Sequence, residues 1–159
     1  MKILGIDPGS RVTGYGAVEK RRNDLVEIIR GEIRPAGQSS TSSSLVAIYA
    51  QLLEIIRRVS PDVVAIEDIF YGKNVKSLIK QAHVRGVAIL AAACCHIPVF
   101  EYTPLEIKQA VVGYGRAEKS QVQTMVKAVL HLSELPQADA ADALAVAICH
   151  ANFLKVLPI

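Results

Sequence analysis

Two carboxylates stand where buried strands are predicted to end. Asp7 follows the apolar residues 3–6, and Glu67 follows a second apolar run, residues 63–66. A short apolar run bounded by turn residues predicts a strand buried on both faces, and open sheets bind ligands at the carboxyl ends of such strands. Asp7 could instead cap the turn formed by residues 8–10, and this residue alone leaves both interpretations open.

Two further carboxylates, Asp139 and Asp142, lie near the start of a predicted helix. They are three residues apart and therefore share one face of that helix. Between Ala138 and Cys149 they are the only polar side chains, and apolar residues all round a helix predict burial. A favourable interaction with the helix dipole explains acids at this end but not their burial without a basic residue within one turn. We therefore interpret both as metal ligands.

The chemistry of four gathered carboxylates is restricted. Carboxylates that lie close together in a low dielectric repel each other, and either protonation or a divalent cation relieves this repulsion. An oxygen-only ligand set without clustered cysteine or histidine favours Mg²⁺, with Mn²⁺ as a substitute. Two such ions about 3.5–4 Å apart fit in-line phosphoryl transfer or phosphodiester hydrolysis. The sequence thus predicts metal-dependent phosphate chemistry.

Basic side chains flank this acidic centre in the sequence. Each alone would be a solvated surface charge, but as a set around an acidic pocket they are typical of phosphate contacts. The set is Lys73, Lys76, Lys80, Lys108, Arg116 and Lys119. Phe70 and Tyr71 could stack on unpaired bases or pack in the core, and both interpretations stay open. His150, about two turns beyond Asp142, is a candidate for proton handling.

The elements that must position these groups follow from periodicity and turn residues. Three closely spaced strands open the chain, and connections this short force antiparallel pairing. Helical crossovers then make two later strands parallel to the first. We expect an α/β fold whose mixed five-stranded sheet has three antiparallel strands, then two parallel ones, with helices on both faces. The strands after the first are predicted at residues 12–18, 25–33, 63–66 and 98–102, and the helices at 45–59, 73–95, 105–112, 122–130 and 136–155, with a loop at 35–44.

Composition limits the class of protein. The 159 residues fit one domain, residues 1–159, and 51% hydrophobic with 21% charged residues argues against disorder. The longest apolar run, residues 87–95, is too short to span a membrane. Three cysteines match neither a disulfide framework nor a zinc spacing, so we expect core thiols in a cytoplasmic protein. A net charge of +3 permits nucleic-acid binding without establishing it.

Several motifs, in one order along nearly the whole chain, resemble the RuvC family of Holliday-junction resolvases. They are GIDPGSRVTGYG at residues 5–16, AIE at 65–67 with Phe70 and Lys73-Asn74, Ala82 with RGVA at 85–88, VVG at 111–113 with AEKSQV at 117–122, and QADAADALA at 137–145.

This resemblance implies a ribonuclease H-like fold and a homodimer. It also implies a Mg²⁺-dependent endonuclease of DNA recombination and repair, which nicks two opposed strands of four-way junction DNA, with the RuvA–RuvB motor as partner. By motif position, Lys108 and Lys119 would lie near the cut strand and Phe70 would enter the junction. The catalytic carboxylates would be Asp7, Glu67, Asp139 and Asp142.

The sequence departs from the family pattern in two places. A serine-rich run occupies residues 39–44 where a charged helix start is expected, and the printed chain stops at Ile159 without the basic tail of some members. Three alternatives compete. Actin-like ATPases and sugar kinases share the opening loop but need a second lobe. A ribosomal-RNA-processing nuclease should lack the Phe70 segment and the pattern at 137–142. A silent junction-binding protein would have lost a carboxylate, and none is lost.

Overall fold

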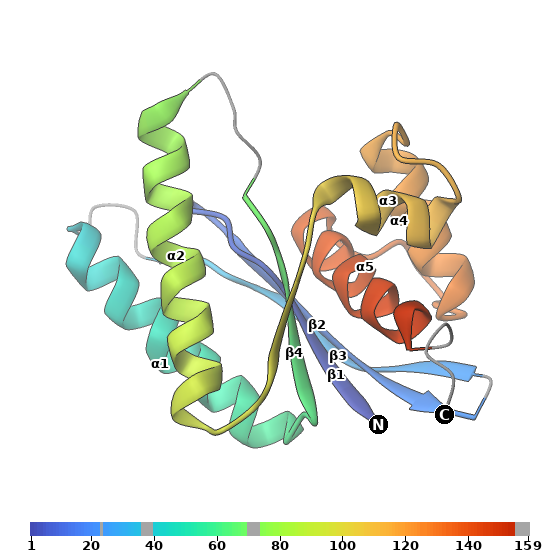
Figure 1. Ribbon diagram of the computed structural model, residues 1–159, viewed down its shortest axis with the longest axis horizontal. Helices are drawn as coiled ribbons and strands as arrows, with labels where there is room; N and C mark the ends of the chain where they lie inside the picture. The colour runs from blue at the N-terminus through green and yellow to red at the C-terminus, as the bar shows by residue number, and fades with distance from the viewer. Residues whose placement is uncertain (23, 36–39, 70–73, 155–159) are drawn as a thin grey trace.

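The computed structural model describes residues 1–22, 24–35, 40–69 and 74–154. Its sheet has the strand order β3-β2-β1-β4-β5 (Figure 1). β1 pairs antiparallel with β2, and β2 with β3, whereas β1 with β4 and β4 with β5 are parallel. The predicted mixed five-stranded sheet is confirmed. The strands are β1 Lys2–Asp7, β2 Thr13–Arg21, β3 Asp24–Ile33, β4 Val63–Glu67 and β5 Val99–Tyr102.

Helices cover both faces of the sheet, as predicted. Two of them, α1 and α2, lie on one face, and α3, α4 and α5 lie on the other (Figure 1). The helices are α1 Thr41–Val59, α2 Val75–Cys94, α3 Pro104–Val112, α4 Lys119–Val129 and α5 Ala138–Phe153. Among the described residues, no helix combines the length and the hydrophobicity that crossing a bilayer requires.

The start of α1 differs from the prediction, which left residues 35–44 as a loop. The helix begins at Thr41, because Ser40 caps it by accepting a hydrogen bond from the Ser43 backbone N–H at 3.2 Å. Serines are tolerated in a first turn that is capped in this way. Other predicted boundaries differ by a few residues, as helix and strand ends commonly do. The expectation of core thiols holds for Cys149 but is wrong for Cys94, which is exposed.

Alternation along β1 sorts its side chains between the two faces of the sheet. Ile3 packs in the core that contains α5, whereas Leu4 and Ile6 pack in the core that contains α1 and α2. Gly5 lies against the α5 backbone, and Asp7 follows in the same alternation. The strand therefore directs the Asp7 carboxylate toward α5.

α5 lies unusually close to β1 and β2. A side-chain carbon at Gly5 would collide with the carbonyl oxygen of Ala143, and one at Gly14 would collide with that of Asp139. Alanines dominate the helix and every residue from Ala143 to Ala151 is buried, so the predicted buried helix is confirmed. This close approach lays the first turn of α5 over the carboxyl end of β1.

Replacing Gly5 with alanine tests this close approach. The added methyl group would meet the Ala143 carbonyl oxygen, which belongs to the helix backbone and cannot rotate away. We expect Gly5→Ala to lower the free energy of unfolding, measured by urea denaturation, by roughly 1–3 kcal/mol. The matched comparison is Gly16→Ala, whose methyl group would meet the buried Leu144 side chain at 2.6 Å and the helix backbone only at 3.0 Å, so it should cost less. Equal losses at both positions would contradict a backbone origin.

Candidate active site

Asp7 and Glu67 lie side by side at the carboxyl edge of the sheet. β1 and β4 pair in parallel with Ile6 opposite Ile66, so the residues that follow them emerge together. The turn after β1 is closed by the Gly9 N–H, which donates to the Asp7 carbonyl oxygen at 3.0 Å. Because the backbone of Asp7 closes this turn, its carboxylate is not needed as a cap, and the metal-ligand interpretation is favoured.

The buried hydroxyl of Thr13 gives this turn a second support. Thr13 Oγ1 donates to the Gly9 carbonyl oxygen at 2.9 Å, and the residue has no exposed surface. Sequence reasoning missed Thr13, although a threonine between a Pro-Gly turn and a glycine-containing strand is a detectable signal. The contact fixes the path of the chain directly after Asp7.

α5 brings Asp139 and Asp142 to the same place. Carboxylate oxygens of Asp7, Asp139 and Asp142 all lie within 4.8 Å of one another. Glu67 lies next to this group, and its negative charge is the largest cause, after burial, of the raised pKa of Asp7. The structure thus brings together all four carboxylates that the sequence singled out, from three separate parts of the chain. A group of this kind can hold a metal ion.

Burial and repulsion from neighbouring carboxylates raise the pKa of Asp7, Glu67 and Asp139. Burial, followed by the negative charges of Glu67 and Asp142, raises the pKa of Asp7 to about 8. Burial and the Asp142 charge also raise the pKa of Glu67, and burial is the main cause of the raised pKa of Asp139. The protein without a bound cation therefore retains a proton near neutral pH, at the position where a cation would relieve the repulsion.

Two lysines line a cavity together with two of the four carboxylates. Lys119, the first residue of α4, places Nζ 2.9 Å from Asp142 Oδ2, and this hydrogen bond raises the pKa of Lys119. Lys108 of α3 and Lys119 line a cavity of about 210 Å³ together with Glu67 and Asp142. No basic residue lies within one turn of Asp142 along α5, and its basic partner comes instead from α4.

The remaining predicted residues lie elsewhere. Lys76 is exposed in the first turn of α2, and Arg116 is exposed between α3 and α4; neither lines the cavity at the carboxylates. Phe70 and Lys73 lie outside the described residues. His150 is buried, and its Nδ1 lies 2.7 Å from the hydroxyl group of Tyr102.

His150 is too far along α5 to act at the acidic cluster. Eight residues separate it from Asp142, which corresponds to about 12 Å along a helix. Burial lowers the pKa of His150, so the ring is neutral near neutral pH. The proton-handling role suggested for His150 therefore finds no support in the geometry.

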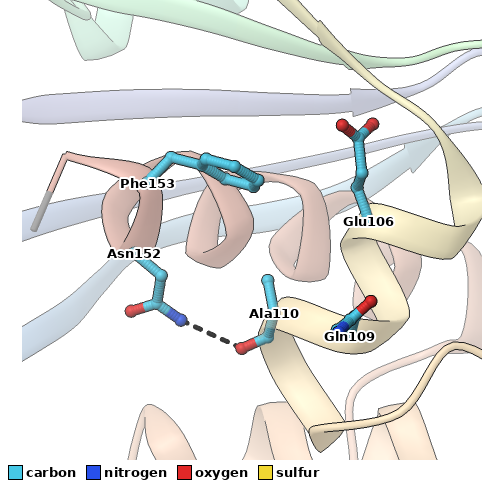
Figure 2. Close-up of a pocket in the computed structure, with 5 residues that line it drawn as sticks. All are labelled: Glu106, Gln109, Ala110, Asn152 and Phe153. Carbon is cyan, nitrogen blue, oxygen red and sulfur yellow. Dashed lines mark hydrogen bonds between the residues drawn. The ribbon is translucent and has the colours of Figure 1, made fainter. Parts of the chain in front are cut away.

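A larger cavity, of about 310 Å³, lies between α3 and the end of α5 (Figure 2). Asn152 Nδ2 donates to the Ala110 carbonyl oxygen at 3.1 Å along its wall. Its one acidic side chain, Glu106, is already engaged, because the Thr103 N–H and hydroxyl group both donate to Glu106 Oε2. None of the four clustered carboxylates lines this cavity, so the smaller cavity is the candidate active site.

Sequence reasoning also missed the role of Arg85 in α2. Its guanidinium lies 2.5 Å from Glu101 Oε2 and 3.3 Å from Asp68 Oδ1. Arg85 thus contacts the residue directly after Glu67. A single arginine within the mainly apolar second half of a helix, with acidic residues at two strand ends, was the available signal.

The chain matches one protein family over most of its length. A family model described as Crossover junction endodeoxyribonuclease RuvC matches residues 3–150. A curated protein of that name from Geotalea uraniireducens is 53% identical over 152 residues, which cover 96% of this chain and 89% of the relative.

Solved structures agree with this match. A structure of RuvC from Thermus thermophilus aligns with a TM-score of 0.88 and 32% identity, covering 98% of this chain and 96% of that one. A structure of T. thermophilus RuvC in complex with a Holliday junction substrate aligns with a TM-score of 0.92 over the same shares, also at 32% identity. The ribonuclease H-like fold expected from the sequence is confirmed.

The raised pKa of Asp7 predicts how stability depends on pH without divalent cations. The folded protein holds a proton on Asp7 up to about pH 8, whereas an unfolded chain releases it near 3.8. The folded state therefore binds more protons in this window, and the free energy of unfolding should fall as the pH rises from 5.5 to 8.5. Mg²⁺ should restore stability most strongly at pH 8.5.

Thermal unfolding of Asp7→Asn provides the test, because the amide removes the titrating group. We expect a flatter dependence of Tm on pH for this variant than for the wild type. Asp24→Asn, which changes an exposed carboxylate at the start of β3, should keep the wild-type slope. A wild-type slope in Asp7→Asn would show that Asp7 does not hold the proton.

Proposed function

The chain belongs to the RuvC family of crossover junction endodeoxyribonucleases, and we propose that it resolves Holliday junctions in homologous recombination and DNA repair. The reaction is metal-dependent hydrolysis of phosphodiester bonds, with paired nicks in two opposed strands. The observation that carries this proposal is the cluster of Asp7, Asp139 and Asp142 at the carboxyl edge of the sheet, with Glu67 and two lysines beside it.

The ligand set fits Mg²⁺, with Mn²⁺ as a substitute, and two ions per site. Its donors are all carboxylate oxygens, which hard divalent cations prefer. The raised pKa of Asp7 is further support, because it reports negative charge that the protein itself does not neutralise. Bound there, the cations would activate a water molecule and stabilise the charge that develops on the phosphate. The ligands would be Asp7, Glu67, Asp139 and Asp142.

The chain's own cations would hold the scissile strand. Lys108 and Lys119 line the cavity next to the carboxylates, where a phosphate that reaches the cluster would meet their ammonium groups. Lys76 and Arg116 are exposed farther away, and with Lys73 they would contribute contacts along the DNA backbone. Phe70 would enter the junction. The RuvA–RuvB complex as a partner rests on the family resemblance alone.

A homodimer explains an apolar surface on α2. Val75, Ile79 and Leu90 fall within one narrow arc of the helix and are 54%, 52% and 54% exposed. A second copy of the chain would cover these side chains about a two-fold axis. Because a four-way junction is itself close to two-fold symmetric, such a dimer presents one cluster of carboxylates to each of two opposed strands.

Cleavage of a synthetic four-way junction beside a matching linear duplex tests the activity. With Mg²⁺, the wild type should nick opposed junction strands at matching positions and leave the duplex largely intact. Asp7→Asn should abolish cleavage and retain junction binding, because it removes one ligand charge and keeps the shape of the side chain. Asp24→Asn is the control and should cut normally.

Other outcomes separate the alternatives. Equal cutting of junction and duplex would indicate a general nuclease, and preference for RNA would indicate an RNA-processing enzyme. Binding without cutting in either Mg²⁺ or Mn²⁺ would indicate a silent binding protein. With Ca²⁺ the enzyme should bind and not cut, because the larger ion accepts looser coordination than in-line hydrolysis requires.

Ile79→Asp tests the dimer. A charge in the centre of the apolar surface should convert the dimer to a folded monomer in sedimentation experiments, and junctions should then receive single nicks instead of paired ones. Val46→Asp is the control, since Val46 is an exposed apolar residue on α1 outside this surface. A dimeric Ile79→Asp variant would refute the assignment of the interface to α2.

A further inference from the structure

Arg85 joins α2 to the ends of two neighbouring strands. Its guanidinium contacts Glu101 of β5 at 2.5 Å and Asp68, the residue after β4, at 3.3 Å. Val84, the preceding residue, is the first buried residue of α2, so the contact forms where the helix first meets the body of the protein. One side chain thus bridges a helix and two strand ends.

These contacts lie on the opposite face of the sheet from the acidic cluster. Ile66 packs in the core with α1 and α2, and Glu101 lies opposite Ile66 in the β4–β5 register. Glu67, between Ile66 and Asp68, faces the other way, toward α5 and Asp7. Arg85 therefore contacts the end of β4 on one face of the sheet, while the Glu67 carboxylate projects from the opposite face.

Two hydrogen bonds fix the backbone directly after Glu67. The Asp68 N–H donates to the Tyr102 carbonyl oxygen at 2.8 Å, and the Ile69 N–H donates to Asp68 Oδ1, also at 2.8 Å. Arg85 contacts that same Asp68 oxygen. Removal of Arg85 would free the side chain that anchors the chain where it leaves β4, one residue after Glu67.

Stability alone does not account for an arginine here. The two acidic partners are each 40% exposed, and ion pairs of this kind contribute little to the free energy of unfolding. Arg85 Nε is buried without a hydrogen-bond partner among the described residues, which is a cost. An arginine that adds little stability and leaves a buried N–H unpaired is typical of a residue that positions a neighbouring functional group.

We propose that Arg85 is a positioning residue that aligns Glu67 for cation binding by clamping the ends of β4 and β5. This inference rests on the proposed function, because it assumes that the carboxylate cluster binds catalytic cations. Residues that orient a metal ligand without touching the metal commonly matter for function. Mutating them typically lowers metal affinity or activity 10–100-fold. Arg85 would act in this way through the backbone of Asp68.

The test uses Arg85→Gln, which keeps much of the length and loses the charge. Mn²⁺ binding to the free protein, measured by calorimetry, should weaken about tenfold. Single-turnover cleavage of the junction should need a correspondingly higher Mg²⁺ concentration and partly recover when Mg²⁺ is raised. Junction binding without divalent cations should stay within about twofold, since Arg85 lies behind the site. Arg85→Lys should be intermediate, because an ammonium group bridges two carboxylates less well.

Two further variants keep the test decisive. Arg21→Gln breaks an exposed pair with Glu19 on β2 and should leave Mn²⁺ affinity unchanged. If Arg85→Gln does not fold, Glu101→Gln removes only the shorter contact and should weaken Mn²⁺ binding in the same direction by a smaller factor. Unchanged Mn²⁺ affinity in folded Arg85→Gln, or in Glu101→Gln if the former does not fold, overturns the inference.

The wild type separates this inference from the proposed function. A wild-type protein that neither binds Mn²⁺ nor cuts junctions would refute the proposed function and this inference together. A wild type that does both, beside an Arg85→Gln variant with the same Mn²⁺ affinity, would refute only the role of Arg85. Equal loss of junction binding and Mn²⁺ binding would also refute it, because that result marks a DNA contact or a general structural defect.

Discussion

The close approach of α5 to β1 and β2 is the constraint on which the acidic cluster depends. Asp7 is fixed by the end of a strand, and Asp139 and Asp142 are fixed by the start of a helix. These groups meet because Gly5 and Gly14 have no side chains where the α5 backbone lies against the strands, and because the alanines of α5 have only small ones. A helix packed at ordinary distance would hold its carboxylates too far from Asp7 to share a cation. The small residues are therefore as necessary to the site as the acids.

The same packing explains why the site favours a cation. Burial of α5 brings carboxylates into a region of low dielectric, where the negative charges of Glu67 and Asp142 raise the pKa of Asp7. Lys119 offsets part of this charge through Asp142, but it approaches from α4 and is itself largely exposed. One flexible, hydrated ammonium cannot neutralise four carboxylates. The fold thus keeps excess negative charge at this site. Because α5 is packed in an apolar core, its carboxylates cannot move away from Asp7 to reduce the repulsion.

Much of this site follows from the sequence, for definite reasons. Apolar runs ending in an acid located Asp7 and Glu67, and an all-apolar helix with two acids located Asp139 and Asp142. Periodicity could not reveal Lys119 as the partner of Asp142, since that contact depends on how α4 packs against α5. The partners of Arg85 were equally hidden, although the arginine itself stands out in the sequence, because they belong to two strand ends that only the sheet register brings together. The early start of α1 was missed because serine is a weak helix former. The cap at Ser40 nevertheless allows the serines that follow to form the first turn of the helix.

Asp7 has a special place among the four carboxylates. It belongs to the compact group with Asp139 and Asp142, and the negative charge of Glu67 also acts on it. Asp7 is therefore the group at which the charges from β4 and from α5 converge, and burial there is compounded by repulsion from both sides. This convergence gives a physical reason for its pKa of about 8. A displacement of either β4 or α5 would therefore change the repulsion that Asp7 meets, so the contacts that position these two elements bear directly on the charge state of Asp7.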